Sequence, residues 1–302
     1  MTKAARGLLL LLLMIGSAAG AGAQSDAFLQ EKGKGQVWLY GGGGSTHVYF
    51  NTEGVQRLLD SVGTSFWSFT IGGALDYGIL DGLELNVDLP IGYYALTSAT
   101  RFPDRSVLAP AWLGLGATYR LTRAPLATAV SATLRIPPGF HDGIYDDPNH
   151  PSFLSDGFLQ AIGALHIAWA GESGWVKGRV GYAFRAEEPV DEIHYGLQAG
   201  FTSIPGTGVF LGIDGVLATE DAATPTRPFY AGAAGDSAEL ERDDGGTGRM
   251  TTVERENYLA LSPGAVVDLG ERITLSMQYQ IRLFGVHSLR INGLYLAGGY
   301  RF

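Results

Sequence analysis

The sequence predicts an all-β fold, a transmembrane antiparallel up-and-down β-barrel of about 12 strands. Apolar and polar residues alternate with a period of two over many long segments, and the connections between these segments alternate between long and short. The chain also begins like a secreted protein, yet no later stretch approaches the roughly 18 uninterrupted apolar residues of a spanning helix. A membrane protein that crosses the bilayer with strands accounts for all three observations.

The N-terminus carries the parts of a cleavable signal peptide. Lys3 and Arg6 form a positive region, residues 8–15 are an apolar run, and residues 21–23 are Ala-Gly-Ala, a small-residue cleavage site. The apolar run is too short for a membrane anchor, which needs about 20 apolar residues. We therefore expect a signal peptide over residues 1–23 and an outer-membrane β-barrel domain over residues 24–302.

The alternation is clearest near the C-terminus. Between residues 272 and 283, apolar side chains on one face alternate with polar ones on the other, which a helix could not achieve. The same pattern predicts twelve strands, and most of them reach the length of about 9–11 residues that a tilted strand needs to cross a bilayer. Their approximate limits are 35–50, 65–79, 83–95, 109–121, 126–137, 157–170, 175–186, 194–203, 208–219, 256–268, 272–284 and 290–302.

The connections between these strands alternate in length. The short ones contain turn residues and cover 80–82, 122–125, 171–174, 204–207 and 269–271. The others are mostly long, with 285–289 as a short exception, and cover 51–64, 96–108, 138–156, 187–193 and 220–255. Short periplasmic turns, longer extracellular loops and an even strand number are typical of outer-membrane barrels, so both termini should lie on the periplasmic side.

A soluble β-sandwich or a lipocalin-like barrel is the alternative fold. Either would bury the apolar face of every strand and leave the other face in water with few charges, since only 17% of the residues are charged. Arg, Gln and Glu on one face and Leu, Tyr and Val on the other fit a polar lumen and a lipid-facing wall better. Aromatic residues near the predicted strand ends fit the girdles of such a wall: Trp67, Tyr77, Tyr119, Trp169, Tyr182, Phe184, Phe201 and Tyr258.

Composition narrows the function further. The chain has no Cys, which excludes disulfides, thiolate metal sites and cysteine nucleophiles. Its net charge of −9 argues against nucleic acid as a partner. Its 44 glycines are roughly twice the average usage, and many lie within predicted strands, where they permit a curved wall and give room to large lumen side chains. We expect no cofactor.

Inward-facing residues of the predicted strands are the candidate functional groups. The acidic ones begin on the second and third strands and the basic ones follow on the fourth to seventh, so we expect a charge-segregated lumen that could select solutes in a small pore. Internal salt bridges that plug a narrow barrel are the other interpretation. The lumen charge clusters comprise Asp76, Glu84, Asp88, Arg120, Arg135, His166, Lys177, Arg179, Arg185, Asp214, Arg272 and Arg282. Inward aromatic residues either line a path for apolar ligands or fill the lumen: Trp38, Trp112, Trp175, Phe210 and Tyr295.

Three segments follow one another in an order typical of a known kind of barrel. Residues 77–85 (YGILDGLEL) lead to Leu89-Pro90, which gives a strand, a short turn, a second strand and a proline. Residues 114–121 (GLGATYRL) and 134–139 (LRIPPG) come next. This order resembles the MetA-pathway of phenol degradation family of outer-membrane barrels, and related uncharacterised barrel families share the layout. The resemblance covers roughly residues 65–215. It implies a barrel in the outer membrane with a role in the transport of small aromatic or hydrophobic compounds, and it implies no catalytic residue.

The last residues complete the expected function. Tyr300 and Phe302 resemble the C-terminal insertion signal of bacterial outer-membrane barrels, so the expected partners are outer-membrane lipid, the barrel-assembly machinery and a small-molecule solute. A lipid hydrolase would need Ser and His within hydrogen-bond reach, but His287 and Ser288 are adjacent and would point to opposite faces of a strand. We therefore expect a channel for passive or gated uptake and no enzyme. An outer-membrane lipid hydrolase, and a structural or adhesion barrel with a plugged lumen, are the alternatives.

One segment between the predicted strands has a different period. Val55, Leu58, Leu59 and Val62 fall at helical spacing and predict a short amphipathic helix over residues 51–63. Such a helix could fold into the barrel mouth or lie on the membrane surface.

Overall fold

The computed structural model describes residues 29–50, 56–58, 65–97, 105–123, 125–137, 159–186, 191–219, 239–241, 247–249, 257–286 and 288–302, and the predicted signal peptide lies outside them. The described part consists mostly of antiparallel strands, and it contains no helix long and apolar enough to cross a membrane. The strands are β1 (Gly35–Thr46), β2 (Val48–Phe50), β3 (Gln56–Leu58), β4 (Ser65–Leu80), β5 (Leu83–Thr97), β6 (Arg105–Pro110), β7 (Leu113–Thr122), β8 (Leu126–Ile136), β9 (Gln160–Ala170), β10 (Gly174–Arg185), β11 (Glu192–Ile204), β12 (Thr207–Ala218), β13 (Glu239–Glu241), β14 (Thr247–Arg249), β15 (Asn257–Leu269), β16 (Ile273–Val286), β17 (Ser288–Leu289) and β18 (Asn292–Arg301).

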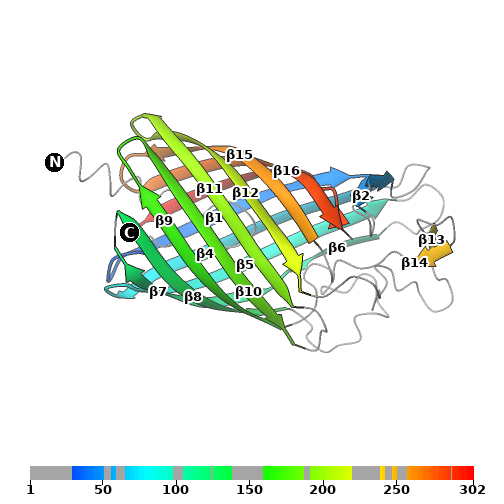
Figure 1. Cartoon of the computed structure of the whole chain (residues 1–302), viewed down its shortest axis with the longest axis horizontal. Helices are drawn as coiled ribbons and strands as arrows, with labels where there is room; N and C mark the ends of the chain where they lie inside the picture. Colours follow the sequence, from blue (N-terminus) through cyan, green and yellow to red (C-terminus); the bar gives the residue numbers. More distant parts are fainter. Residues whose placement is uncertain are drawn as a thin grey trace.

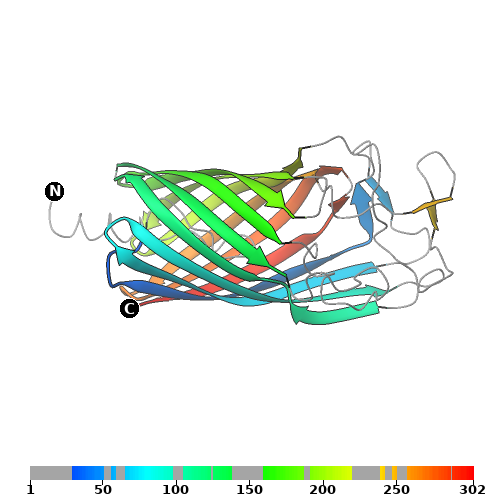
Figure 2. The same ribbon diagram turned by 90° about the horizontal axis from the view of Figure 1, so that it is seen from below.

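The long strands close into a barrel because the first pairs with the last. β1 lies between β4 and β18, and the pairing continues antiparallel around the sheet until β5 returns to β4. β6 and β7 both pair with β5, so they form one wall strand that is interrupted at Ala111 and Trp112. The wall therefore has twelve strands, which confirms the predicted fold class. Figures 1 and 2 show these strands tilted against the barrel axis.

The two ends of the barrel differ in the way that the sequence predicts. The short turns contain Gly82, Gly206 and Gly270, whose φ angles of 92°, 76° and 72° favour glycine. The first and last wall strands also meet at this end, where Gly35 N donates to Phe302 O at 3.1 Å and Phe302 N donates to Gly35 O at 3.0 Å. In outer-membrane barrels this is the periplasmic end.

A small sheet lies at the opposite end, where β2 pairs with β3 and with β17 (Figure 2). The helix predicted over residues 51–63 is therefore wrong for its described part, because Gln56–Leu58 are extended and pair with β2 in antiparallel register. A short isolated helix is marginal in water, so pairing with a neighbouring strand outweighs the helical spacing. The predicted first strand, residues 35–50, is divided at His47 into β1 and β2.

The barrel is polar inside and apolar outside. Large apolar side chains alternate along the wall strands and stay exposed, such as Ile71 at 53% and Leu211 at 50%. The residues between them face inward, and many of these are polar or charged and buried, among them Asp76, Glu84, Asn86, Asp88, Thr118, His166, Lys177 and Arg185. A soluble barrel or sandwich would show the reverse. The chain has the fold of an outer-membrane β-barrel, with an outer wall suited to lipid.

Glycine and aromatic residues face each other on neighbouring strands inside this wall. A Cβ added at these glycines would lie only 2.2–2.8 Å from the nearest atom of the aromatic side chain opposite. Each ring therefore occupies the space that the missing side chain leaves, an arrangement known to support glycine in strands. The directly opposed pairs inside the barrel are Trp38–Gly299, Tyr40–Gly72, Trp175–Gly200, Phe210–Gly264 and Tyr295–Gly42. Tyr195 and Gly215 form the same kind of pair on the outer face, which they share with the exposed Leu197 and Ile213. Part of the glycine excess thus serves a lumen lined with aromatic rings.

Seven of the eight predicted girdle residues are exposed on the outer face, namely Trp67, Tyr77, Tyr119, Trp169, Tyr182, Phe184 and Phe201. Tyr258 is the exception, and its assignment to the lipid face is wrong. It shares a face of β15 with Ala260 and Ser262, which are both buried in the interior. Its ring lies 4.1 Å from the Arg282 guanidinium carbon, a stacking contact with a residue of the lumen.

Candidate functional site

The acidic residues of β4 and β5 lie in a hydrogen-bonded network inside the barrel. Asn86 Nδ2 donates to Asp76 Oδ1 at 2.8 Å and to Glu84 Oε1 at 2.9 Å. Thr118 Oγ1 on β7 donates to Asn86 Oδ1 at 3.0 Å. The side-chain amide of Asn86 thus donates to two buried carboxylates, which lowers the free-energy cost of burying them.

The segment before β1 enters the lumen at its periplasmic end. Leu29 and Gln30 are buried there, and the backbone N of Gln30 donates to Glu84 Oε2 at 2.7 Å. Arg120 Nη2 on β7 donates to the carbonyl O of Leu29 at 2.9 Å. Two of the predicted lumen charges thus hold a piece of backbone that narrows this end of the barrel.

The third acidic residue, Asp88, lies further along β5. It accepts hydrogen bonds from Tyr40 Oη at 2.5 Å and from Trp112 Nε1 at 3.1 Å. The Arg135 guanidinium carbon lies 4.9 Å from the centroid of the Trp112 ring. Two aromatic donors and a nearby cation therefore surround this carboxylate, and both aromatic residues become part of the site.

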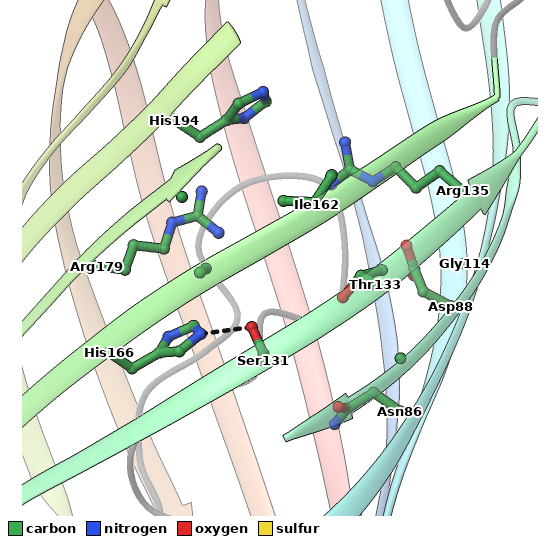
Figure 3. A pocket seen from close by; sticks show the side chains of 13 residues that line it. Asn86, Asp88, Gly114, Ser131, Thr133, Arg135, Ile162, His166, Arg179 and His194 are labelled. Carbon is green, nitrogen blue, oxygen red and sulfur yellow. Dashed lines mark hydrogen bonds between the residues drawn. The ribbon is translucent and has the colours of Figure 1, made fainter. Parts of the chain in front are cut away.

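A cavity of about 60 Å³ opens beside Asp88 within the lumen (Figure 3). The lining residues come from β5 and from β7 to β11, and they are Asn86, Asp88, Gly114, Gly116, Ser131, Thr133, Arg135, Ile162, Ala164, His166, Arg179, Gly181 and His194. Four of the predicted site residues meet here: Asp88, Arg135, His166 and Arg179. Figure 3 shows the side chains of Arg135 and Arg179 reaching into the cavity from β8 and β10.

The space exists because several inward positions carry small residues. Gly114 and Gly116 lie on β7, Gly181 lies on β10 and Ala164 lies on β9. A Cβ at Gly181 would lie 3.0 Å from the Cβ of Ala164, so the wall is already closely packed behind the cavity. Larger side chains at these positions would fill the cavity or push the strands apart.

The structure brings together a serine and a histidine that sequence reasoning did not connect. Ser131 Oγ lies 2.8 Å from His166 Nε2 (Figure 3). Ser131 is on β8 and His166 is on β9, and the two strands pair in antiparallel register with Ala129 opposite His166. Inward phase and hairpin register together could have found this diagonal pair, but spacing along the chain could not.

A second charged group lies toward the opposite end of the lumen from the turns. Arg185 on β10 forms an ion pair with Glu192 on β11, and the two side chains are 2% and 6% exposed. His194 Nε2 lies 3.0 Å from Glu192 Oε2, and Asp191 Oδ1 accepts from Arg185 N at 3.0 Å. Arg185 is thus tied to two carboxylates of the next strand and its approach. The structure adds His194 to the lumen groups, a residue placed by its sequence next to an outer loop.

The remaining lumen charges, Lys177, Asp214 and Arg282, lie on β10, β12 and β16. Asp214 on β12 accepts from Ser262 Oγ at 3.2 Å and from Gln280 Nε2 at 3.0 Å. Lys177 Nζ on β10 lies 5.5 Å from the centroid of the Trp175 ring. Lys177 beside Trp175 and Arg282 beside Tyr258 each place a cation against an aromatic face.

Arg272 does not belong to this set. It precedes β16, is exposed in the turn after β15, and donates from Nη1 to the hydroxyl of Tyr300 at 3.4 Å. Strand phase alone suggested an inward direction, but the strand begins one residue later, at Ile273. Tyr300 and Phe302 both have exposed side chains at the closing strand.

Within the described residues, no group of three or more His, Asp or Glu side chains is arranged to hold a metal ion.

Comparison with known proteins supports the fold. No model of a known protein family and no curated protein matches the sequence. A solved structure, the COG4313 outer membrane channel from Pseudomonas putida F1, has a TM-score of 0.64 at 17% identity, with 92% of this chain and 99% of that chain covered. The chain shares the fold of that channel. The expectation of an outer-membrane barrel of this kind is confirmed at the level of the fold.

Two further solved structures are more distant. The NanC porin has a TM-score of 0.46 at 6% identity, with 87% of this chain and 98% of that chain covered. The β domain of the Bordetella autotransporter BrkA has a TM-score of 0.47 at 12% identity, with 89% of this chain and 99% of that chain covered.

Proposed function

We propose that the chain is a narrow outer-membrane channel for small solutes, with aromatic and hydrophobic compounds among them. The observation that supports this best is the cavity inside a polar lumen, enclosed by a wall whose outer face is apolar. A barrel of purely structural role needs no cavity lined by guanidinium and imidazole groups. Charged side chains that surround a narrow pore are one means by which channels select solutes.

The aromatic lining supports the choice of solute. Trp38, Tyr40, Trp175 and Phe210 all face the interior, and Trp175 and Phe210 are neighbours with ring centroids 6.1 Å apart. Aromatic rings that are fixed over glycine offer flat faces at little cost in conformational entropy. Tyr40 and Phe210 are only partly buried, so their rings are the ones that a small aromatic solute would meet.

Liposome swelling tests the proposal. Vesicles that contain the purified protein should swell in isosmotic phenylalanine, a small aromatic zwitterion that crosses lipid slowly, and should not swell in the trisaccharide raffinose. Gly196→Trp should slow the swelling, because Gly196 faces the lumen with 3.7 Å between its added Cβ and Arg179 Cγ. Gly163→Trp is the matched control, since Gly163 is exposed and has no neighbouring heavy atom within 4 Å of an added Cβ. Vesicles with folded protein that swell in neither solute would contradict the channel.

The contact between Ser131 and His166 favours a hydrolase as the second candidate function. A histidine beside a serine hydroxyl can accept its proton and make the oxygen a nucleophile. Incubation with p-nitrophenyl esters of short and long acids tests this function. Hydrolysis that is lost in Ser131→Ala, while the variant stays folded, would support the enzyme over the channel.

A further inference from the structure

Most charges of the lumen already have partners within the barrel. Asp88 accepts from two aromatic donors, and Asp214 accepts from a hydroxyl and an amide. Glu192 is bound by Arg185 and His194. These carboxylates are satisfied by groups other than Arg179.

Arg179 is different. It lies on β10 opposite Gly196 of β11 and opposite His166 of β9, and its side chain reaches into the cavity (Figure 3). In the described part of the chain, no hydrogen bond or ion pair joins its guanidinium to another residue. Arg179 is only half-buried, so its N–H donors are open to an anionic ligand in the cavity.

The surroundings indicate which ligand would fit. The charged residues of the cavity lining are Arg135, Arg179 and Asp88, so the lining carries one net positive charge when both histidines are neutral. One negative charge would balance it, whereas a dianion would leave an excess. A guanidinium presents paired N–H donors that match the two oxygens of a carboxylate.

The neighbours of Arg179 suit both ends of an organic acid. His166 can add an N–H donor to the anion through Nδ1 from the adjacent strand β9, because its Nε2 can accept from Ser131 Oγ. Ile162 and Ala164 give the same cavity an apolar side, and the glycines of β7 leave room beside it. We propose that this cavity binds the carboxylate of a small organic monoacid with an apolar or aromatic body, held chiefly by Arg179. The inference rests on the proposed function, since it names the class of solute that the channel would take.

Binding to the purified, detergent-solubilised chain tests the inference. Isothermal titration calorimetry with benzoate should give saturable binding, whereas benzamide, which has the same shape and no charge, should bind at least tenfold more weakly. Arg179→Gln should weaken benzoate binding at least tenfold and leave benzamide unaffected. Lys177→Gln is the matched control, because Lys177 is a cation on the same face of β10 but outside the cavity lining. It should bind benzoate like the wild type.

Several results would overturn the inference. These are equal affinities for benzoate and benzamide, equal losses in Arg179→Gln and Lys177→Gln, or inorganic phosphate that competes as strongly as benzoate does. The comparison of benzoate with benzamide needs no variant, so it decides the question even if Arg179→Gln fails to fold. Swelling in phenylalanine without selective benzoate binding would refute this inference and leave the channel intact. Selective benzoate binding by vesicles that do not swell would refute the channel and leave the binding site intact.

Discussion

Replacing Gly200 by alanine tests whether the inward glycines receive aromatic rings. Gly200 on β11 lies opposite Trp175 on β10, and a Cβ added there would lie 2.3 Å from the indole Cε2. The ring has little room to retreat. Trp175 is 3% exposed, packs against Phe210, and has Lys177 Nζ 5.5 Å from its centroid.

The expected cost follows from this distance. Carbon atoms in contact lie about 3.5–4.0 Å apart, so the new Cβ forces the ring or the strand to move by more than about 1 Å. Overpacking of this kind costs about 1–3 kcal/mol. Gly163→Ala is the matched control, because its Cβ meets no heavy atom within 4 Å and should stabilise by about 0.4–1 kcal/mol through the unfolded chain. The unfolded-chain effect is common to both Gly→Ala variants, so they should differ by the overpacking cost, about 1–3 kcal/mol in the free energy of unfolding.

Urea titration of the protein folded in lipid vesicles measures this difference. Tryptophan fluorescence follows the unfolding, and heat-modifiable migration on a gel reports the folded fraction independently. If Gly200→Ala is as stable as Gly163→Ala, the rings do not depend on the glycines opposite them and the reasoning fails.

Three other predictions concern the wall, the periplasmic end and the terminus. Ile213→Arg, at the centre of the outer face of β12, should lower the free energy of unfolding in vesicles by about 2–4 kcal/mol, whereas Leu217→Arg near the strand end should cost about 0–1 kcal/mol. Equal costs would contradict a lipid-facing wall. Glu84→Ala removes the acceptor of the backbone N–H of Gln30, so the segment before β1 should be held less firmly in the lumen and single-channel conductance should rise. An unchanged conductance would show that this segment does not limit the current. Phe302→Ala should reduce the protein recovered in the outer-membrane fraction, and full recovery would refute its role as an insertion signal.

The fold could be predicted because the environment of a barrel strand determines the residue pattern within that strand alone. Each residue faces either lipid or lumen, so the alternation in a segment such as β16 is visible without knowledge of its neighbours. Strand number and direction then follow from the turns. The same reasoning placed Asp88, Arg135, His166 and Arg179 on the inner face, where they line one cavity.

The wrong predictions concern residues whose direction or secondary structure depends on the phase of a strand, on where it begins, or on pairing with a distant strand. Tyr258 was predicted to face lipid, although the phase of β15 turns it toward Arg282. Arg272 has inward phase but lies one residue before its strand begins. Gln56–Leu58 became a strand because β2 offers pairing that the local pattern does not reveal. Of these cases, only Gln56–Leu58 shows tertiary pairing that overrides local propensity.

The contacts inside the lumen could not be predicted from the sequence, because they depend on the register between strands. Ser131 and His166 are 35 residues apart and meet only through the register of β8 with β9. Likewise, the pairing of each aromatic ring with a glycine needs the exact cross-strand partner, which a one-residue slip would change for every pair.

Single-channel recording in planar bilayers tests the central claim most directly. Purified protein that is folded by the gel criterion should give small, discrete conductance steps, and Gly196→Trp should make these steps smaller while Gly163→Trp leaves them unchanged. A folded protein that inserts into the bilayer and gives no steps would contradict the claim that the lumen is a passage.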